Sequence, residues 1–221
     1  MLLTKKKQLF SLRENSVISF VGYANFLKIN LETLNSINWF VDGITLSKVF
    51  SLLKINVEKN SFDFTGVAHD IFIWCIKNNY QIHFIGGTIN DAKIFKIKIK
   101  NKYPKLRISV QDGFDSIKKF NYNSLENVDV CVYGLGSPLQ EIISTKNKYL
   151  FKYSFTCGAF ITQTANAKDN YYTPFIIKFN LRWLYRIYKE EGHFKRLFYA
   201  FLKIPSIYIK SKKIINSNNY I

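Results

Sequence analysis

The segment 128–141, which reads VDVCVYGLGSPLQE, combines residue types that could bind a phosphorylated ligand. Gly134 and Gly136 permit a backbone to approach a ligand closely, and Pro138 suits the first turn of a helix. The N–H groups at the start of such a helix can hold a diphosphate. The segment therefore indicates a diphosphate-binding turn between a strand and a helix.

Two polar side chains, Gln140 and Glu141, fall in the first turn of the same predicted helix and would face the opening of the same diphosphate-binding site. The segment matches neither the GxxxxGK[ST] phosphate loop nor the GxGxxG dinucleotide fingerprint. The sequence also has no Cys-x-x-Cys spacing, no Asp-x-Asp pair and no histidine with a partner at metal-ligand spacing. We therefore expect no metal site and no cofactor.

Short apolar runs rich in β-branched and aromatic residues predict the strands that must carry such loops. These strands are residues 17–22, 37–41, 81–87, 107–110 and 128–136. The helices predicted from periodicity and start signals are 65–78 (N-cap Thr65), 88–101 (opened by Thr88) and one from Pro138. The alternation of strands and helices predicts an α/β fold with a Rossmann-like parallel sheet flanked by helices.

Glycine or aspartate lies at the carboxyl end of four of the predicted strands. The resulting loops are Asp42-Gly43, Gly86-Gly87, Asp112-Gly113 and 134–140. In parallel α/β sheets, ligands bind outside the carboxyl ends of the strands. The four loops together would therefore form one site, although each loop alone is also compatible with an ordinary turn.

The composition indicates a folded, strongly basic protein. The chain has 221 residues, and 32 Lys and Arg against 15 Asp and Glu give a net charge of +17. Hydrophobic residues make up 48% and aromatic residues 17%, which excludes a disordered polycation. The positive charge of such a folded protein implies nucleic acid, an anionic membrane or a phosphorylated substrate as partner. Because no apolar run reaches 18 residues and no signal peptide is recognisable, we expect a cytoplasmic protein whose membrane contact is peripheral.

The composition changes near residue 175, which predicts an α/β domain, 1–175, and a basic helical C-terminal appendage, 176–221. Residues 178–221 hold ten Lys and Arg against two Glu, including three of the five arginines of the chain. Aromatic and basic residues interleaved in this way are typical of an amphipathic segment on an anionic bilayer. The alternative is a helix pair packed on the sheet with a solvated basic face.

The segment 135–141 resembles the LG-x-P-[K]-QE motif of the WecG/TagA/CpsF glycosyltransferase family. Other segments resemble motifs of that family in the same order, from about residue 17 to about residue 200. They are Phe40–Ile44 (FVDGI), Phe84–Gly87 (FIGG), Tyr103–Leu106 (YPKL), Gly113-Phe114, Cys157–Phe160 (CGAF), Pro174 and Trp183–Arg186 (WLYR). The order of the motifs makes the resemblance specific at the level of a family.

The resemblance implies transfer of a sugar, typically N-acetylmannosamine, from a UDP donor to an undecaprenyl-diphosphate-linked sugar, with inversion and without a metal. It implies synthesis of a bacterial surface polysaccharide (capsule, teichoic acid or O-antigen) at the inner face of the plasma membrane. The partners implied are the UDP-sugar donor, the polyprenyl-diphosphate-linked acceptor and an anionic membrane surface contacted by 176–221. No nucleic acid is expected, and a homo-oligomer is left open.

Through the resemblance, Asp42 matches an aspartate proposed as general base, which is needed because the acceptor hydroxyl must lose a proton as it attacks. The alternative role of Asp42 is to cap the turn before Gly43. Gln140 matches a glutamine thought to contact the donor sugar or its phosphate. Asn25 is aligned with an asparagine of the first loop, with a shorter spacing to Asp42 than the family has.

Two arginines of the tail complete the expected site. Arg186 and Arg196 match family arginines that could offset the charge of the leaving UDP or hold the lipid diphosphate, and their alternative role is a solvated basic face. The residues expected to bind substrate are Asn25, Gly86, Gly87, Gly113, Gly134, Gly136, Pro138, Gln140, Glu141, Arg186 and Arg196, with Asp42 as the catalytic residue.

The chain departs from the family pattern at several positions. Arg182 stands where the family has a Glu, His193 stands where it has an arginine, and residues 65–69 replace a Gly-Ser-Asp-Leu-like segment. These departures leave the donor and acceptor sugars open. Two other functional classes are retained as alternatives: a basic nucleic-acid-binding protein, and a non-catalytic membrane scaffold of a polysaccharide synthesis complex.

Overall fold

The computed structural model describes residues 1–113, 125, 127–167, 174–179, 181–189, 194, 198–199 and 202–216. These residues contain a six-stranded, all-parallel sheet with the strand order β2-β1-β6-β5-β3-β4. The strands are β1 (Ser16–Gly22), β2 (Asn38–Asp42), β3 (Gln81–Gly86), β4 (Arg107–Gln111), β5 (Val130–Gly134) and β6 (Tyr153–Thr156). The predicted Rossmann-like sheet and five of its strands are confirmed, whereas β6, in the middle of the sheet, is not among the predicted strands.

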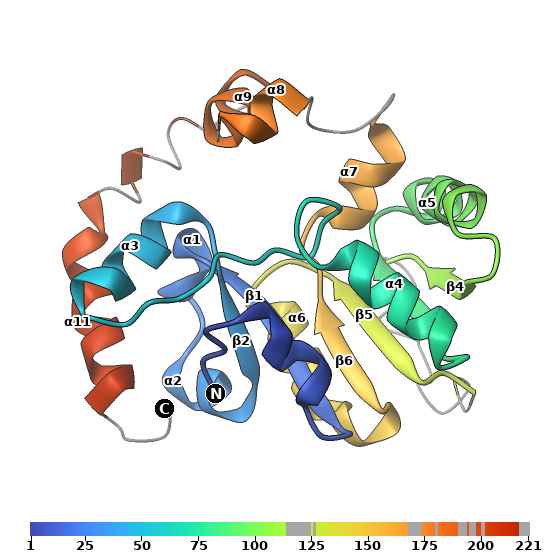
Figure 1. Ribbon diagram of the computed structural model, residues 1–221, viewed down its shortest axis with the longest axis horizontal. Helices are drawn as coiled ribbons and strands as arrows, with labels where there is room; N and C mark the ends of the chain where they lie inside the picture. The colour runs from blue at the N-terminus through green and yellow to red at the C-terminus, as the bar shows by residue number, and fades with distance from the viewer. Residues whose placement is uncertain are drawn as a thin grey trace.

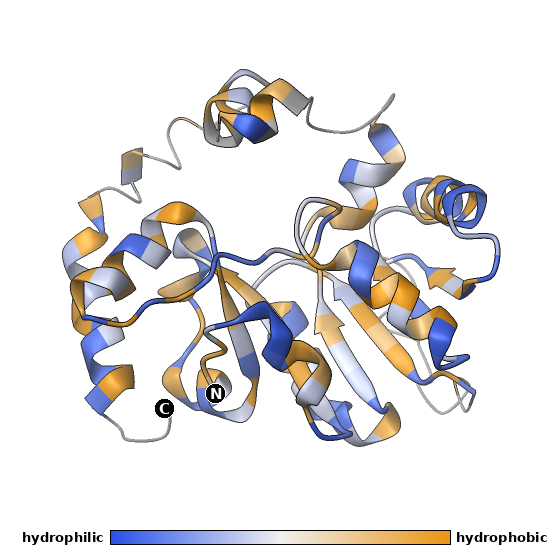
Figure 2. Ribbon diagram, viewed as in Figure 1, coloured by the Kyte–Doolittle hydropathy of each residue, from blue (hydrophilic) through white to orange (hydrophobic). Residues whose placement is uncertain are grey.

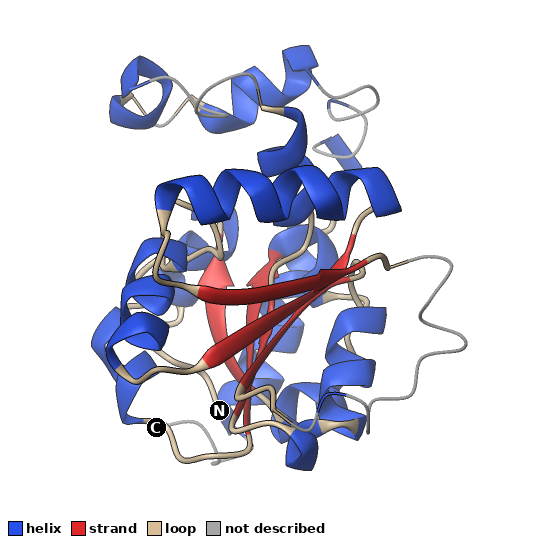
Figure 3. Cartoon of the chain, turned by 90° about the vertical axis from the view of Figure 1, so that its right-hand side faces the viewer, coloured by secondary structure: helices blue, strands red, loops and turns tan. Residues whose placement is uncertain are grey.

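Helices cover both faces of the sheet, as Figures 1 and 3 show. One layer contains α4 (Ala68–Lys77), α5 (Ile89–Lys102) and α7 (Phe160–Asn166). The other contains α1 (Tyr23–Phe26), α2 (Leu31–Ser36) and α6 (Leu139–Lys146), with α3 (Ile44–Leu52) following β2. Two short 3₁₀ helices, η1 (Lys6–Ser11) and η3 (Lys148–Leu150), precede β1 and β6.

Strand β1 illustrates how the sheet divides the core into two layers. Alternate side chains of a strand point to opposite faces. Ile18 and Phe20 belong to the apolar cluster beneath α4, α5 and α7, whereas Val17 and Val21 belong to the cluster beneath α1, α2 and α3. A central strand buried on both faces has a nearly continuous apolar sequence, which is why this strand could be predicted.

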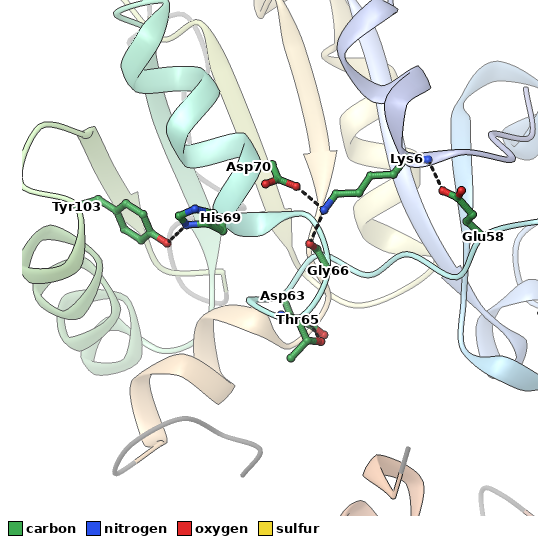
Figure 4. A network of polar contacts seen from close by, with 8 residues as sticks. All are labelled: Lys6, Glu58, Asp63, Thr65, Gly66, His69, Asp70 and Tyr103. Atoms are coloured by element: carbon green, nitrogen blue, oxygen red, sulfur yellow. Dashed lines mark hydrogen bonds and ion pairs between the residues drawn. The ribbon is translucent and has the colours of Figure 1, made fainter. Parts of the chain in front are cut away.

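The structure confirms one predicted helix start and corrects another. Thr88 caps α5 as predicted: its hydroxyl accepts the Asp91 N–H, and the Asp91 carboxylate accepts the Thr88 N–H. The prediction that Thr65 caps α4 is wrong, because that helix begins at Ala68. Thr65 instead donates its backbone N–H to the Asp63 carboxylate at 2.7 Å within the preceding loop. Figure 4 labels both residues.

The C-terminal part of the chain contains α8 (Pro174–Lys178), α9 (Arg182–Lys189) and α11 (Ile204–Asn216). In Figure 1, α8 and α9 lie beyond the ends toward which β5 and β6 point, and α11 lies beside α3. In the described part of the chain, no helix combines the length and the hydropathy that crossing a membrane requires.

Helix α11 packs on the α/β core. Ile207 and Ile214 are buried in the cluster that includes Phe26, and Lys210 donates to the carbonyls of Phe26 and Ile29. Desolvation by burial lowers the pKa of Lys210. Figure 2 shows apolar and polar residues interleaved along α11, the pattern of a helix with one buried face. The domain boundary at residue 175 stays a prediction, but α11 packs against residues that precede it.

His83 is buried in β3, and its Nδ1 lies 2.8 Å from Ser109 Oγ. Desolvation by burial lowers the pKa of His83 from 6.5 to about 4. The imidazole of His83 takes up a proton at a higher pH in the unfolded chain than in the folded protein. The contribution of neutral His83 to the free energy of unfolding is therefore fully present above pH 6.5 and is lost as the pH falls toward 4.

We therefore expect His83 to lower the free energy of unfolding by about 2 kcal/mol between pH 7 and pH 5. Urea titrations at both pH values measure this change in the wild type and in His83→Asn, which has no group titrating in this range. The variant should lose about 2 kcal/mol less than the wild type over this pH interval. Equal losses in the two proteins would contradict the assignment.

Candidate active site

The parallel sheet brings the loops singled out from the sequence to one edge. Gly22 of β1 is in register with Asp42 of β2, and Gly86 of β3 is in register with Gly134 of β5. Each of these residues ends its strand, and Asp112-Gly113 directly follows β4. The predicted grouping of the strand-end loops is therefore confirmed for the backbone.

Three of the glycines are required by contacts between neighbouring loops. A Cβ on Gly86 would lie 2.5 Å from the carbonyl oxygen of Gly134, and a Cβ on Gly134 would lie 2.9 Å from that of Gly158. A Cβ on Gly113 would lie 2.8 Å from Gly86 Cα. Gly86 and Gly87 are buried at this edge. The missing side chains thus let the ends of β3, β4, β5 and β6 pack backbone against backbone.

Three other glycines at the same edge have open space where a side chain would stand. Gly43, Gly136 and Gly158 have φ values of +93°, +76° and +55°, which favour glycine. Apart from its chain neighbours, a Cβ on any of them would meet no heavy atom of the described residues within 4 Å. Gly136 and Gly158 follow the adjacent strands β5 and β6. Their backbones are therefore accessible to a ligand.

Asp42 and Asn25 lie at the β1–β2 side of the edge. Asp42 is the last residue of β2, Asn25 belongs to α1 directly after β1, and both are partly exposed. Strand β5, which carries the Gly136 loop, is three strand spacings from β2, about 14 Å. Gly158 follows β6 and lies between the two. The edge therefore holds a carboxylate and a glycine-rich helix start within the reach of one elongated ligand.

The start of α6 has the features of an anion-binding helix terminus. Pro138 is the N-cap residue and the helix begins at Leu139. The Gln140 N–H donates to the carbonyl of Gly136 at 3.0 Å. Positive charge from the helix dipole develops at this end. The acidic residue of the first turn is Glu141, whose side chain is buried behind the loop.

A buried polar cluster lies behind the Gly136 loop. The Glu141 carboxylate accepts hydrogen bonds from Ser19 Oγ and Gln140 Nε2, both at 2.9 Å, and from Ser137 Oγ at 2.7 Å. Gln140 Oε1 accepts the Gly158 N–H at 3.2 Å. Gln140 and Glu141 are both buried, so the structure places these side chains behind the edge rather than facing its mouth.

Several members of this cluster were not among the predicted site residues. They are Ser19, Ser137, Thr156 and Gly158. Ser19 Oγ also lies 2.8 Å from Thr156 Oγ1 at the end of β6. A serine within an otherwise apolar strand is a usable signal, because a buried hydroxyl needs a polar partner. The partners themselves cannot be read from the sequence.

The two predicted arginines belong to the C-terminal part. Arg186 is in α9, which lies beyond the carboxyl ends of β5 and β6 in Figure 1. Arg196 and His193 lie outside the described residues. The structure therefore brings the backbone of α9 to the predicted side of the sheet.

The cysteines are not candidates for chemistry at this edge. Cys75, Cys131 and Cys157 are free and buried, and desolvation by burial raises the pKa of Cys131 to about 12. The same cause raises the pKa of Cys75 and Cys157. Such thiols are not ionised near neutral pH and are poor nucleophiles. Over the described ranges, no group of three or more His, Cys, Asp or Glu could hold a metal ion.

Figure 4 shows a second polar network beside α4. Lys6 forms an ion pair with Asp70 and donates to the Gly66 carbonyl at 3.1 Å, and the Lys6 N–H donates to Glu58 at 2.8 Å. These contacts tie the N-terminal segment to α4 and to the loop between α3 and α4. We assign this network a structural role.

A hollow of about 460 Å³ lies at the opposite, amino ends of the strands, where Asn15, Arg107 and Lys152 contribute to its lining. Lys152 pairs with Asp129 at 3.0 Å, and Arg107 donates to the Asn79 carbonyl at 3.1 Å. Since these cations already have partners within the protein, we place the candidate site at the carboxyl edge instead.

The arrangement at the carboxyl edge defines a class of protein. A helix start and two accessible glycine backbones suit the phosphates of an activated donor, and a carboxylate at the same edge can accept a proton. These are the requirements of an enzyme that transfers a group from a nucleotide-linked donor to a hydroxyl.

Comparison with known proteins identifies the family. The model of the Glycosyl transferase WecG/TagA/CpsF family matches residues 31–217. The chain is also 30% identical over 222 residues to the UDP-Gal:alpha-D-GlcNAc-diphosphoundecaprenol beta-1,4-galactosyltransferase of Shigella boydii, across 94% of this chain and 92% of that protein. The chain belongs to the WecG/TagA/CpsF family and is a glycosyltransferase, which confirms the resemblance seen in its motifs.

Proposed function

We propose that this protein moves a sugar, with inversion, from a UDP donor to a sugar carried on undecaprenyl diphosphate during synthesis of a bacterial surface polysaccharide. The observation that carries the proposal is the shared edge of Asp42 and the α6 start in a chain of this family. The relative from S. boydii acts, by its name, on UDP-Gal and GlcNAc-diphosphoundecaprenol, which supports donor and acceptor of these classes.

The donor diphosphate binds at the Gly136 loop and the start of α6, with the Gly158 backbone on its other side. Both glycines have the open space that such a contact needs. The donor sugar then extends past the ends of β6 and β1 toward Asp42. This direction follows from the strand order, because β1 and β6 lie between β5 and β2, which ends in Asp42, and the loop after β5 is about 14 Å from β2.

Asp42 accepts the proton of the acceptor hydroxyl. The acceptor oxygen forms a bond to the anomeric carbon, the bond from that carbon to the UDP oxygen breaks, and the hydroxyl proton passes to the Asp42 carboxylate. UDP leaves with the electron pair of the broken bond. A single displacement of this kind inverts the configuration at the anomeric carbon. Asn25, in the neighbouring helix α1, helps to orient the acceptor.

The donor is a UDP-hexose or UDP-N-acetylhexosamine, with galactose and N-acetylmannosamine as the first candidates. Incubating the protein with a synthetic lipid-diphosphate acceptor and a panel of UDP-sugars tests this. We expect one donor to give a lipid-linked product whose new linkage has the opposite anomeric configuration to the donor. Absence of product with every donor would contradict the proposed donor and acceptor classes.

The C-terminal part brings the enzyme to an anionic membrane surface at the cytoplasmic face. Large apolar side chains are exposed there in unusual number, among them Phe175, Phe179, Tyr188, Phe194, Phe198, Tyr199 and Leu202. Exposed aromatic side chains interleaved with Lys and Arg suit the interface of an anionic bilayer. The acceptor diphosphate lies at that interface, so this placement would bring the carboxyl edge to its substrate, with Arg186 and Arg196 near the phosphates.

Vesicle binding tests the membrane contact. Replacing Tyr188, Phe194 and Phe198 together by Ser should weaken binding to phosphatidylglycerol vesicles at least tenfold, as measured by co-sedimentation, and should leave the unfolding temperature unchanged. Tyr149→Ser is the matched control, since Tyr149 is 75% exposed but lies at the amino ends of the strands. Equal vesicle binding by the triple variant and the wild type would contradict this placement.

A further inference from the structure

The carboxylate of Glu141 is an unusual group to find in the interior of this protein. Glu141 is 0% exposed, and no Lys or Arg of the described residues lies within ion-pair distance of its carboxylate. Its hydrogen bonds come instead from neutral groups of Ser19, Ser137 and Gln140. Burying a carboxylate without a cation costs free energy that such bonds offset only in part. A stable core alone does not require a Glu at this position.

Two of the three donors connect Glu141 to the two open glycine loops. Ser137 belongs to the loop that contains Gly136, and its hydroxyl donates to Oε2 at 2.7 Å. Gln140 donates to Oε1 and, through its own carbonyl oxygen, accepts the Gly158 N–H. One carboxylate therefore fixes the loop after β5 directly and the loop after β6 through one side chain.

Ser19 adds a third element to the connection. Its hydroxyl lies 2.9 Å from Glu141 Oε1 and 2.8 Å from Thr156 Oγ1. Ser19 is in β1 and Thr156 is the last residue of β6, directly before the Gly158 loop. The middle of β1, the end of β6 and the loop after β5 are thus joined by hydrogen bonds around the same buried group.

We propose that Glu141 is a positioning residue that sets the separation of the Gly136 and Gly158 loops, so that both backbones face the same nucleotide diphosphate. This inference rests on the proposed function. It differs from the expectation that Glu141 binds substrate, because the buried carboxylate acts through Ser137 and Gln140. Gln140 has the same kind of role toward Gly158.

Two serines of the same region allow a matched test. Ser137 Oγ donates to the Glu141 carboxylate, whereas Ser144 Oγ, also in contact with residue 141, donates to its backbone carbonyl at 3.1 Å. Ser137→Ala should weaken UDP binding about tenfold in calorimetry and raise KM for the donor with little change in kcat. Ser144→Ala should leave both values as in the wild type. Equal UDP affinity in the two variants would overturn the proposal.

Hydrogen exchange provides a readout that does not depend on activity. In Glu141→Ala the Gly158 amide should exchange at least tenfold faster than in the wild type, while the amides of β3 and β5 stay protected. Glu141→Gln should restore most of the protection, because its carbonyl oxygen can still accept from Gln140 and its amide can donate to the Ser137 hydroxyl. Unchanged exchange at Gly158 in Glu141→Ala would overturn the positioning role.

The two readouts separate this inference from the proposed function. A wild type that binds no UDP and transfers no sugar would refute the proposed function, while the exchange of Gly158 would still report on Glu141. If Glu141→Ala fails to fold, the UDP affinities of Ser137→Ala and Ser144→Ala decide for a protein that binds UDP. For a protein that binds no UDP, the Gly158 amide should exchange faster in Ser137→Ala than in Ser144→Ala, and equal exchange rates would overturn the proposal.

Discussion

Asp42→Asn should reduce sugar transfer by about 10²–10⁴-fold, the usual contribution of a general base. The amide keeps the size of the side chain at the end of β2 but cannot take the proton of the acceptor hydroxyl. The pairing of Asp42 with Gly22 in the sheet involves the backbone, so the fold should be retained. Steady-state transfer to a lipid-diphosphate acceptor measures the loss in kcat, and calorimetry with UDP checks that the donor still binds.

Asp70→Asn is the control for this experiment. Asp70 is also partly exposed, but its ion pair with Lys6 lies in the network beside α4. Its substitution should leave kcat within about twofold of the wild type, as expected for a surface change. Wild-type turnover by Asp42→Asn would show that Asp42 is not the base. A loss of UDP affinity equal to the loss of turnover would instead indicate a role in binding.

Ile207→Ala should lower the free energy of unfolding by about 2–5 kcal/mol, the usual result of removing a large buried aliphatic side chain. Ile207 lies in the segment that the sequence assigns to a basic appendage, yet it is 0% exposed and belongs to the core cluster beneath α1 and α3. Urea unfolding followed by far-UV circular dichroism measures the change.

Ile209→Ala is the matched control on the same helix. Ile209 is 56% exposed, so its truncation should cost well under 1 kcal/mol. Vesicle binding by Ile207→Ala at a temperature where it is folded should equal that of the wild type. Equal stabilities of the two variants would mean that α11 does not pack on the core in solution.

Much of the fold could be predicted from the sequence because the central strands carry local signals. Val128–Gly136 and Gln81–Gly87 are apolar runs that end in glycine, and Thr88 with Asp91 forms a capping box that depends only on nearby residues. Strand β6 escaped prediction because Tyr153–Thr156 is only four residues long and three of its residues carry hydroxyls. Its assignment as a strand depends on pairing with β1 and β5.

The candidate site was predictable in its backbone but not in its side-chain contacts. Glycines and aspartates at strand ends must meet at one edge of a parallel sheet, so their grouping follows from topology. The bond between Ser19 and Glu141 joins residues 122 positions apart, and no local pattern encodes it. Likewise, the periodicity of α11 identifies an apolar face but not whether lipid or the core covers it.

The central claim is that the carboxyl edge binds the nucleotide diphosphate, and a crystal structure of the full chain with UDP tests it most directly. We expect the phosphates within hydrogen-bond distance of backbone N–H groups in the Gly136 and Gly158 loops and at the start of α6. The terminal oxygens of the β-phosphate, one of which carries the sugar in the donor, should face Asp42. UDP bound at the amino ends of the strands, beside Arg107 and Lys152, would contradict the claim.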